Sequence, residues 1–249
     1  MVLKFMLTLA VPLLFAGCVY HSAAVLKAPV SALPGQPADH TPLADAEPPP
    51  LTDQDVQRYF MEIALGSEYG LGDFTIKKWV QDIQLEVLGE PTGEDMETLR
   101  KVVAELNELL DMRIRIELVS SGGNVKLHFI PHQAFSQYEP PGIIFYGGFF
   151  WNWWNFAGEI HTGQIVIGSD RLSQAERNHL IREEVTQTLG LMNDSMRYRD
   201  SIFYQGRTET DRFSEIDRQL IRMLYSDGIS AGMNIFDLRA TLLAGGGGY

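Results

Sequence analysis

The stretch from Phe74 to Phe129 restricts most strongly what this chain can fold into, because its apolar period changes along the way. Phe74–Leu88 is rich in β-branched and aromatic residues, which predicts a strand. Glu94–Leu110 carries apolar residues at helical spacing and predicts an amphipathic helix. Alternating residues in Ile114–Leu118 and in Val125–Phe129 predict two further strands. Strand, helix, strand, strand is the opening of a mixed sheet, so we expect an α+β domain.

The first 17 residues resemble a targeting signal rather than part of the fold. Lys4 precedes an apolar run of about 12 residues, too short to span a bilayer and typical of a secretory signal. The run ends in Phe15-Ala16-Gly17-Cys18, which resembles a bacterial lipobox and implies cleavage before Cys18 and lipid attachment to its thiol. An ordinary signal peptide or a short membrane anchor is the alternative. Cys18 is the only cysteine, so neither an internal disulfide nor a cysteine-based zinc site can form.

A proline-rich segment follows the lipobox. Residues 19–50 hold seven of the twelve prolines, cannot bury a core and form an extended tether. We expect a signal peptide (1–17), a lipidated cysteine with its tether (18–50), one domain that opens with a helix over Leu51–Leu65 (51–240), and a flexible glycine-rich tail (241–249). Val19 stands where an Asp marks inner-membrane retention, so the resemblance implies an outer-membrane lipoprotein of the bacterial cell envelope that faces the periplasm.

The charge of the chain restricts its partners. Acidic residues outnumber basic ones 32 to 20, the formal charge is −12, and no basic run exists. Phosphate backbones are bound by clustered Lys and Arg, so we expect no nucleic-acid partner. The expected partners are a membrane, through the lipid anchor, and a protein, peptide or glycan ligand.

The segment Tyr138–Phe156 is dense in aromatic residues, interleaved with glycines and asparagines. One interpretation is a loop whose rings fold back onto the core. The other is an exposed aromatic surface for a glycan, peptide or lipid surface. The candidate residues of that surface are Phe149, Phe150, Trp151, Trp153 and Trp154. Ile160–Gly168 then follows as a predicted strand.

A polar helix comes next. Ser173 and Glu176 form a capping-box pattern at its start, the helix is predicted over Gln174–Leu189, and Gly190 is placed to end it. On this helix His179, Glu183 and Gln187 recur every four residues and share one face, with Glu184 beside them and Ile181, Val185 and Leu189 on the opposite side.

The segment from Glu183 to Asp194 resembles the metzincin zinc motif HExxHxxGxxH. The spacing is kept, but the ligands differ: Glu183, Gln187 and Asn193 stand where the motif has its three histidines. Glu184 keeps the position of the general base, and Gly190 keeps the turn. Ser201-Ile202-Phe203-Tyr204 lies where matrixin-type members carry their Met-turn, again without the Met.

Downstream, Phe213–Asp217 and Leu220–Tyr225 are similar to the C-terminal helix of that group, and Gly232-Met233 follows. By this combined pattern, residues 70–235 are identified as a member of the bacterial domain-of-unknown-function family 2927, whose members are often predicted lipoproteins. The resemblance implies a zincin-like fold, with a mixed sheet, an active-site-type helix and a C-terminal helix. It implies no activity.

The substitutions leave three interpretations open. Zinc prefers imidazole and thiolate, so Gln187 and Asn193 would hold it weakly, while a hard cation such as Ca²⁺ could use these oxygens with Asp194. In the first interpretation, the domain has a binding or accessory role, with a polar network in place of the metal. Alternatively, it is a metal-dependent peptidase or amidase acting on peptide or peptidoglycan, with Glu184 as base and Glu183 joined by His179 or His161. Third, the polar face is merely solvated. A divalent metal is the only candidate cofactor. Ser201 is not expected to act as a nucleophile, because the sequence shows no base that would activate it.

Overall fold

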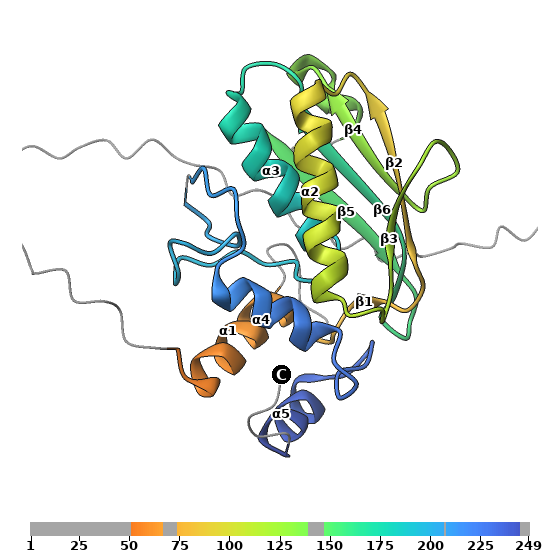
Figure 1. Ribbon diagram of the computed structural model, residues 1–249. Coiled ribbons are helices and arrows are strands. Elements are labelled where there is room, and N and C mark those ends of the chain that lie inside the picture. Colours follow the sequence, from red (N-terminus) through yellow and green to blue (C-terminus); the bar gives the residue numbers. More distant parts are fainter. Residues whose placement is uncertain (1–50, 67–73, 139–146, 207, 245–249) are drawn as a thin grey trace, which may run out of the picture.

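The computed structural model describes residues 51–66, 74–138, 147–206 and 208–244 (Figure 1). The predicted signal peptide, Cys18 and the tether lie outside these residues, as do Phe145 and Tyr146. The domain is built on a six-stranded sheet in the order β1-β6-β4-β2-β3, with β5 paired to β6. Its strands are β1 (Lys78–Trp79), β2 (Ile83–Gly89), β3 (Ile116–Val119), β4 (Val125–Ile130), β5 (Gly148–Trp154) and β6 (Glu159–Gly168).

The sheet is mixed, as predicted, because one strand runs against the others. β5 pairs antiparallel with β6, while the pairings among β1, β2, β3, β4 and β6 are parallel. The parallel pair β2 and β3 is connected through helix α2 (Gly93–Leu109), as parallel strands require a crossover. The predicted α+β class is confirmed.

The strand predicted over Phe74–Leu88 is in fact two short strands with different partners. β1 pairs with β6, whereas β2 pairs with β3 and β4. The chain turns between them at Asp82, whose Oδ1 accepts from the Arg115 N–H at 2.8 Å. The Asp82 carbonyl accepts from Asn124 Nδ2 at 2.9 Å. A carboxylate is not tolerated in a buried strand, and this turn places it at the surface.

The helices form two groups. α2 and α3 (Gln174–Gln187) lie side by side against one face of the sheet, while α1 (Asp53–Leu65), α4 (Glu215–Leu224) and α5 (Ile235–Ala244) gather at one end of it (Figure 1). A short 3₁₀ helix, η1 (His132–Gln137), follows β4. Helices α1, α2, α3 and α4 each begin at a complete capping box, which satisfies the otherwise unpaired first-turn amides. The predicted start at Ser173 is confirmed.

The aromatic run forms β5 and packs on both faces of the sheet. Phe150 joins the main core, while Phe149 and Trp151 join a second cluster with Phe135 of η1 and Val166 of β6. Phe149, Phe150 and Trp151 are at most 4% exposed, so the prediction of an exposed aromatic surface is wrong for these three residues. Trp153 and Trp154 are half-buried and pack against the two clusters.

The domain extends beyond its predicted end at residue 240. α5 reaches Ala244 and buries Leu238 and Leu242, which lie one turn apart. Gln57 Nε2 of α1 donates to the Leu242 carbonyl at 3.3 Å. The residues 241–244 assigned to the flexible tail are therefore helical, because this face of α5 is held by α1. In the described part of the chain, no helix is long and apolar enough to cross a membrane.

A buried lysine connects β1 to the end of α4. Lys78 Nζ donates to the carbonyls of Leu224 at 2.7 Å and Ile229 at 2.9 Å, and lies 4.8 Å from the centroid of the Tyr225 ring. Leu224 is the last residue of α4, so the ammonium caps the C-terminus of this helix and also holds Ile229 in the segment that follows it. Burial lowers the pKa of Lys78 to about 8.

This pKa predicts that Lys78 makes stability depend on alkaline pH. Between about pH 8 and the ordinary value of 10.5, the unfolded chain holds a proton that the folded chain has released, so folding becomes more favourable as pH rises. Allowing for partial solvation, wild type should gain about 1 to 2 kcal/mol over Lys78→Met across this window. Urea unfolding of both proteins at pH 7.5 and 10 measures the difference. The prediction is contradicted if the free energy of unfolding of wild type, relative to that of Lys78→Met, is no higher at pH 10 than at pH 7.5.

Candidate functional site

The C-terminal end of α3 is fixed by side chains from three other elements. The Thr188 carbonyl accepts from Trp79 Nε1 at 2.9 Å and from Asn152 Nδ2 at 3.0 Å. The next carbonyl, of Leu189, accepts from the Tyr225 hydroxyl at 2.9 Å. These donors satisfy carbonyls that a helix end leaves unpaired, so β1, β5 and the end of α4 together set the direction in which the chain leaves α3.

Gly190 makes the turn that follows α3. Its φ is +118°, and a Cβ there would lie 2.0 Å from the backbone oxygen of Lys77. Only glycine fits this conformation and this close approach. The predicted role of Gly190 is confirmed, although α3 itself ends at Gln187 rather than Leu189.

Gln187 is buried and bonded to the segment beyond the turn. Its Nε2 donates to Asp194 Oδ1 at 2.6 Å, and the side chain is 4% exposed. A carboxylate oxygen can only accept, so the amide must turn its NH₂ group toward Asp194. The Gln187 side chain thus holds Asp194 rather than offering its NH₂ end to a cation.

Asn193 binds the end of α1. Its backbone N–H donates to the Ile63 carbonyl at 3.2 Å, and its Nδ2 donates to the Glu62 carbonyl at 3.0 Å. Ser195 Oγ adds a 2.5 Å bond to the Glu62 carboxylate, which also accepts from Arg197 Nε at 3.0 Å. Asn193 therefore caps α1 and ties it to the segment that follows α3.

Glu183 and His179 pair with each other along α3. His179 Nε2 lies 3.2 Å from Glu183 Oε2, and its Nδ1 lies 2.9 Å from the Thr210 carbonyl. Both ring nitrogens of His179 are therefore occupied by protein oxygens. His161, the other candidate metal ligand, is exposed on β6, and its Nδ1 lies 3.1 Å from Thr162 Oγ1.

Glu184 is the most buried acid of α3. It is 3% exposed, and its Oε1 lies 3.2 Å from the position that a Cβ on Gly148 would take. The glycine at the start of β5 thus leaves room for this carboxylate. The predicted base position is a buried acid next to the antiparallel edge strand.

These donors do not fit a divalent metal. Across the ranges that the structure describes, no three His, Cys, Asp or Glu residues are grouped as a metal site would require. The amides of Gln187 and Asn193 point their NH₂ groups at internal acceptors, in separate directions. Metal sites need several deprotonated donors around one point.

A second polar network is fully buried between α1 and α4. Ser201 Oγ donates to Asp217 Oδ1 at 2.6 Å and lies 2.9 Å from the Tyr59 hydroxyl. Asp217 Oδ2 accepts from the N–H groups of Ile202 and Ser214. Burial raises the pKa of Asp217, while these hydrogen bonds act in the opposite direction. All three side chains have no exposed surface, so the network is structural and Ser201 is no nucleophile.

Sequence reasoning missed Trp79 and Asn152 as supports of the site. Asn152 is an amide in the middle of a buried aromatic strand, flanked by Trp151 and Trp153, and it is 1% exposed. A buried polar side chain there needs a partner, which the α3 end supplies through the Thr188 carbonyl. An asparagine between two tryptophans was the available signal.

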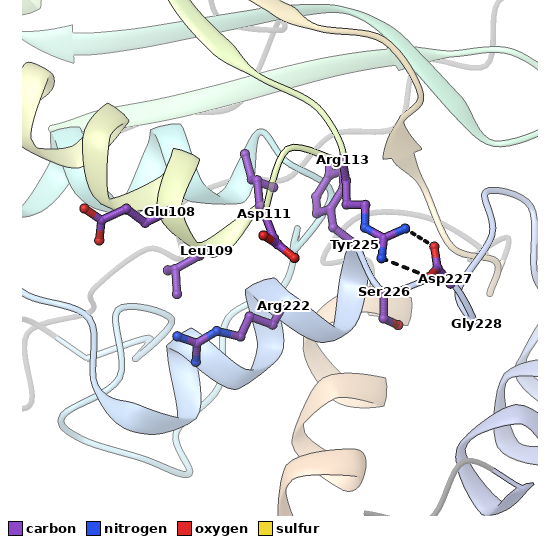
Figure 2. A pocket seen from close by; sticks show the side chains of 10 residues that line it. Glu108, Leu109, Asp111, Arg113, Arg222, Tyr225, Ser226, Asp227 and Gly228 are labelled. Carbon is purple, nitrogen blue, oxygen red and sulfur yellow. Dashed lines mark hydrogen bonds and ion pairs between the residues drawn. The ribbon is translucent and has the colours of Figure 1, made fainter. Parts of the chain in front are cut away.

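A surface cavity lies away from α3. It measures about 610 Å³ and opens between the C-terminal ends of α2 and α4 (Figure 2). Arg113 and Asp227 form a two-bond ion pair at its side, and Arg222, Glu108 and Asp111 complete its charged lining. Three carboxylates and two guanidinium groups nearly balance, and none of the lining residues belongs to α3 or β5.

The described elements follow the layout that the resemblance to zincins implies. A mixed sheet with one antiparallel strand is followed by a polar helix, a glycine turn and a C-terminal helix, in the order that the resemblance implies. The chain belongs to the family described as protein of unknown function DUF2927, whose model matches residues 53–244.

Solved structures give more distant likenesses. A structure of myroilysin is 15% identical, covering 61% of this chain and 83% of its own, with a TM-score of 0.35. A second crystal structure of myroilysin is 14% identical, covering 63% of this chain and 88% of its own, with a TM-score of 0.37. Among proteins with curated descriptions, none matches the sequence.

The capping role of Asn193 can be tested by exchanging its amide for a carboxylate. In Asn193→Asp, an oxygen replaces the donor that faces the Glu62 carbonyl, so we expect a loss of about 1 to 3 kcal/mol at pH 7. Acidification should recover part of the loss, because a protonated carboxyl can donate again. Urea unfolding at pH 7 and 4.5 measures both effects, with Glu97→Gln on the exposed face of α2 as control. A variant as stable as wild type at pH 7 would rule out the cap.

Proposed function

We propose that this protein is an envelope lipoprotein whose zincin-like domain binds an extended polypeptide rather than hydrolysing one with a metal. One observation carries the proposal. Gln187 and Asn193, which stand at the metal-ligand positions of the related motif, donate hydrogen bonds to Asp194 and to the end of α1. Their polar groups hold the segment after α3 to α3 and α1 without an ion.

The outer edge of β5 is where we propose that the polypeptide binds. The Gly168 N–H donates to the Gly147 carbonyl, so by alternation the backbone groups of Gly148, Phe150 and Asn152 face away from β6. No described strand pairs with that edge, but Gly148, Phe150 and Asn152 are themselves buried, so an added strand has to displace what covers them. An edge strand of this kind accepts an added strand through main-chain hydrogen bonds. Glu184 lies next to its first residue.

A peptide library tests this proposal. Phage displaying 12-residue peptides are selected on the soluble chain, residues 19–249, and an enriched peptide is then used in amide hydrogen exchange. The proposal expects slower exchange at Gly148, Phe150 and Asn152, because their amides gain a partner. Failure to enrich any peptide, or protection confined to other elements, contradicts it.

A metal-dependent peptidase or amidase is the second candidate, and the burial of Glu184 favours it. A carboxylate 3% exposed beside the edge strand is placed as a general base would be. The same soluble chain is incubated with peptide and peptidoglycan fragments, with and without added Zn²⁺ or Ca²⁺. Metal-stimulated cleavage that is lost in Glu184→Gln would establish this candidate and refute the binding role.

Membrane attachment through Cys18 is part of the proposal. The lipobox resemblance and the proline-rich tether support an outer-membrane lipoprotein facing the periplasm. Mass spectrometry of the N-terminal peptide of the mature protein should find a cysteine carrying acyl chains. Fractionation of cells expressing Cys18→Ser should find the protein released from membranes. An unmodified N-terminus in the wild type contradicts the anchor.

A further inference from the structure

Three phenylalanines are exposed on the domain. Phe74 is 58% exposed, Phe236 is 80% exposed, and Phe156 is fully exposed. Leaving such rings in water forgoes the stabilisation that their burial would bring. Phe156 is also unnecessary for its turn, because Asn155 Oδ1 accepts the N–H groups of Ala157 and Glu159 and supplies the turn chemistry itself.

The segments that carry these rings meet at one corner of the molecule. Thr75, next to Phe74, forms an antiparallel bridge with Asn234, two residues before Phe236. Gly158, two residues after Phe156, is packed so closely that a Cβ would lie 2.5 Å from the backbone nitrogen of Gly232. We call Phe74, Phe156 and Phe236 the aromatic corner.

α5 extends the aromatic corner with an apolar face. Phe236, Ala240 and Leu243 lie at i, i+4 and i+7 and are exposed, with Leu243 80% exposed. The opposite face of α5 buries Leu238 and Leu242. One exposed stripe of the helix is therefore apolar, beside the exposed Asp237 and Arg239, and exposed apolar surface of this kind marks an interaction site.

The position of the chain's N-terminal part indicates what covers this surface. Fifty residues precede Leu51, and the chain enters the described domain at α1. α1 packs on α5 through the Gln57 bond to Leu242, and both helices lie at the same end of the domain (Figure 1). A lipid anchor at Cys18 would hold this domain within tether reach of a bilayer. At the high effective concentration this creates, even weak partitioning is sufficient.

We propose that the aromatic corner and the outer face of α5 dock on the phospholipid surface, so that the domain lies on the membrane to which it is tethered. The proposal rests on the lipid anchor proposed above. Phenylalanine and leucine side chains that project from the surface of a helix enter the boundary between headgroups and acyl chains. The formal charge of −12 opposes anionic lipid, so the attraction is apolar and a zwitterionic surface is sufficient.

Vesicle flotation with the unlipidated chain, residues 19–249, tests the surface independently of the anchor. Wild type should float with phosphatidylcholine–phosphatidylethanolamine vesicles. Phe156→Ser combined with Phe236→Ser should lower the partition coefficient at least about tenfold. The control is Met196→Ser, which removes another exposed apolar side chain, from the segment after α3, and should float like wild type. Equal thermal midpoints exclude unfolding.

A second readout locates the contact. Residues 19–249 contain no cysteine, so Phe156→Cys can carry a polarity-sensitive dye as the only label. Its emission should shift to the blue with vesicles, while a dye at Ala104→Cys on the exposed face of α2 should not respond. Absence of flotation, flotation unchanged in the double variant, or wild type that ignores vesicles but dimerises through these phenylalanines would each overturn the proposal. Lipidation of Cys18 is scored separately, so failure of the anchor and failure of the surface are distinguishable.

Discussion

Gly190→Ala should lower the free energy of unfolding by about 3 to 5 kcal/mol. A residue with a Cβ is strained at a φ of +118°, and the added carbon would lie 2.0 Å from the Lys77 carbonyl oxygen. That oxygen belongs to the backbone just before β1, so it cannot move away as a flexible side chain would. The turn must open, and Gln187 must then separate from Asp194.

Urea unfolding followed by circular dichroism measures this loss. The matched control is Gly93→Ala at the start of α2, where nothing lies within 4 Å of the new carbon and φ is helical. Alanine favours helix, so this control should gain up to about 1 kcal/mol. A Gly190→Ala variant within about 1 kcal/mol of wild type would show that the turn after α3 is not the constrained element described above.

Asp217→Ala should destabilise the domain by about 3 to 5 kcal/mol. The substitution removes the acceptor of the Ser201 hydroxyl and the Ile202 N–H, both buried, and of the half-buried Ser214 N–H. It also removes the capping-box carboxylate of α4. The three elements that meet at this network, α1, the turn at Ser201 and α4, should lose cooperativity together.

Two further variants separate burial from charge. Asp217→Asn keeps one acceptor oxygen and should recover part of the loss. Asp227→Ala removes a carboxylate whose side chain is 79% exposed and should leave stability close to wild type. If Asp217→Ala unfolds at the same urea concentration as Asp227→Ala, the buried network contributes nothing to stability.

The strands and helices with a clear period were predictable from the sequence. β4 alternates between buried and more exposed residues, and the capping box at Ser173 marks the true start of α3. β5 was taken for a loop because its aromatic residues are buried on both faces, so they show no alternation. α5 was missed because its apolar residues face both the core and the surroundings, and because a glycine run follows it.

For the site, spacing identified the residues but not their partners. The four-residue interval correctly placed His179 and Glu183 on one face of α3, where they form a pair, and the glycine turn was recognisable. The Asn193 bond to Glu62 joins residues 131 positions apart, and the Trp79 bond to Thr188 joins residues 109 apart. Such pairs form only when α1 and β1 dock on the segment after α3, and no local pattern encodes that docking.

Metal content of the soluble chain tests the central claim most directly, namely that Gln187 and Asn193 serve as internal hydrogen-bond donors rather than as ligands. Residues 19–249, purified without chelator or histidine tag, are analysed for metals beside Glu183→Ala after both are equilibrated with Zn²⁺ and Ca²⁺ and desalted. We predict far less than one equivalent of any metal in both proteins, and we expect the added metal ions to leave the thermal midpoint of each protein unchanged. Close to one equivalent in the wild type, lost in a folded Glu183→Ala, would contradict the account.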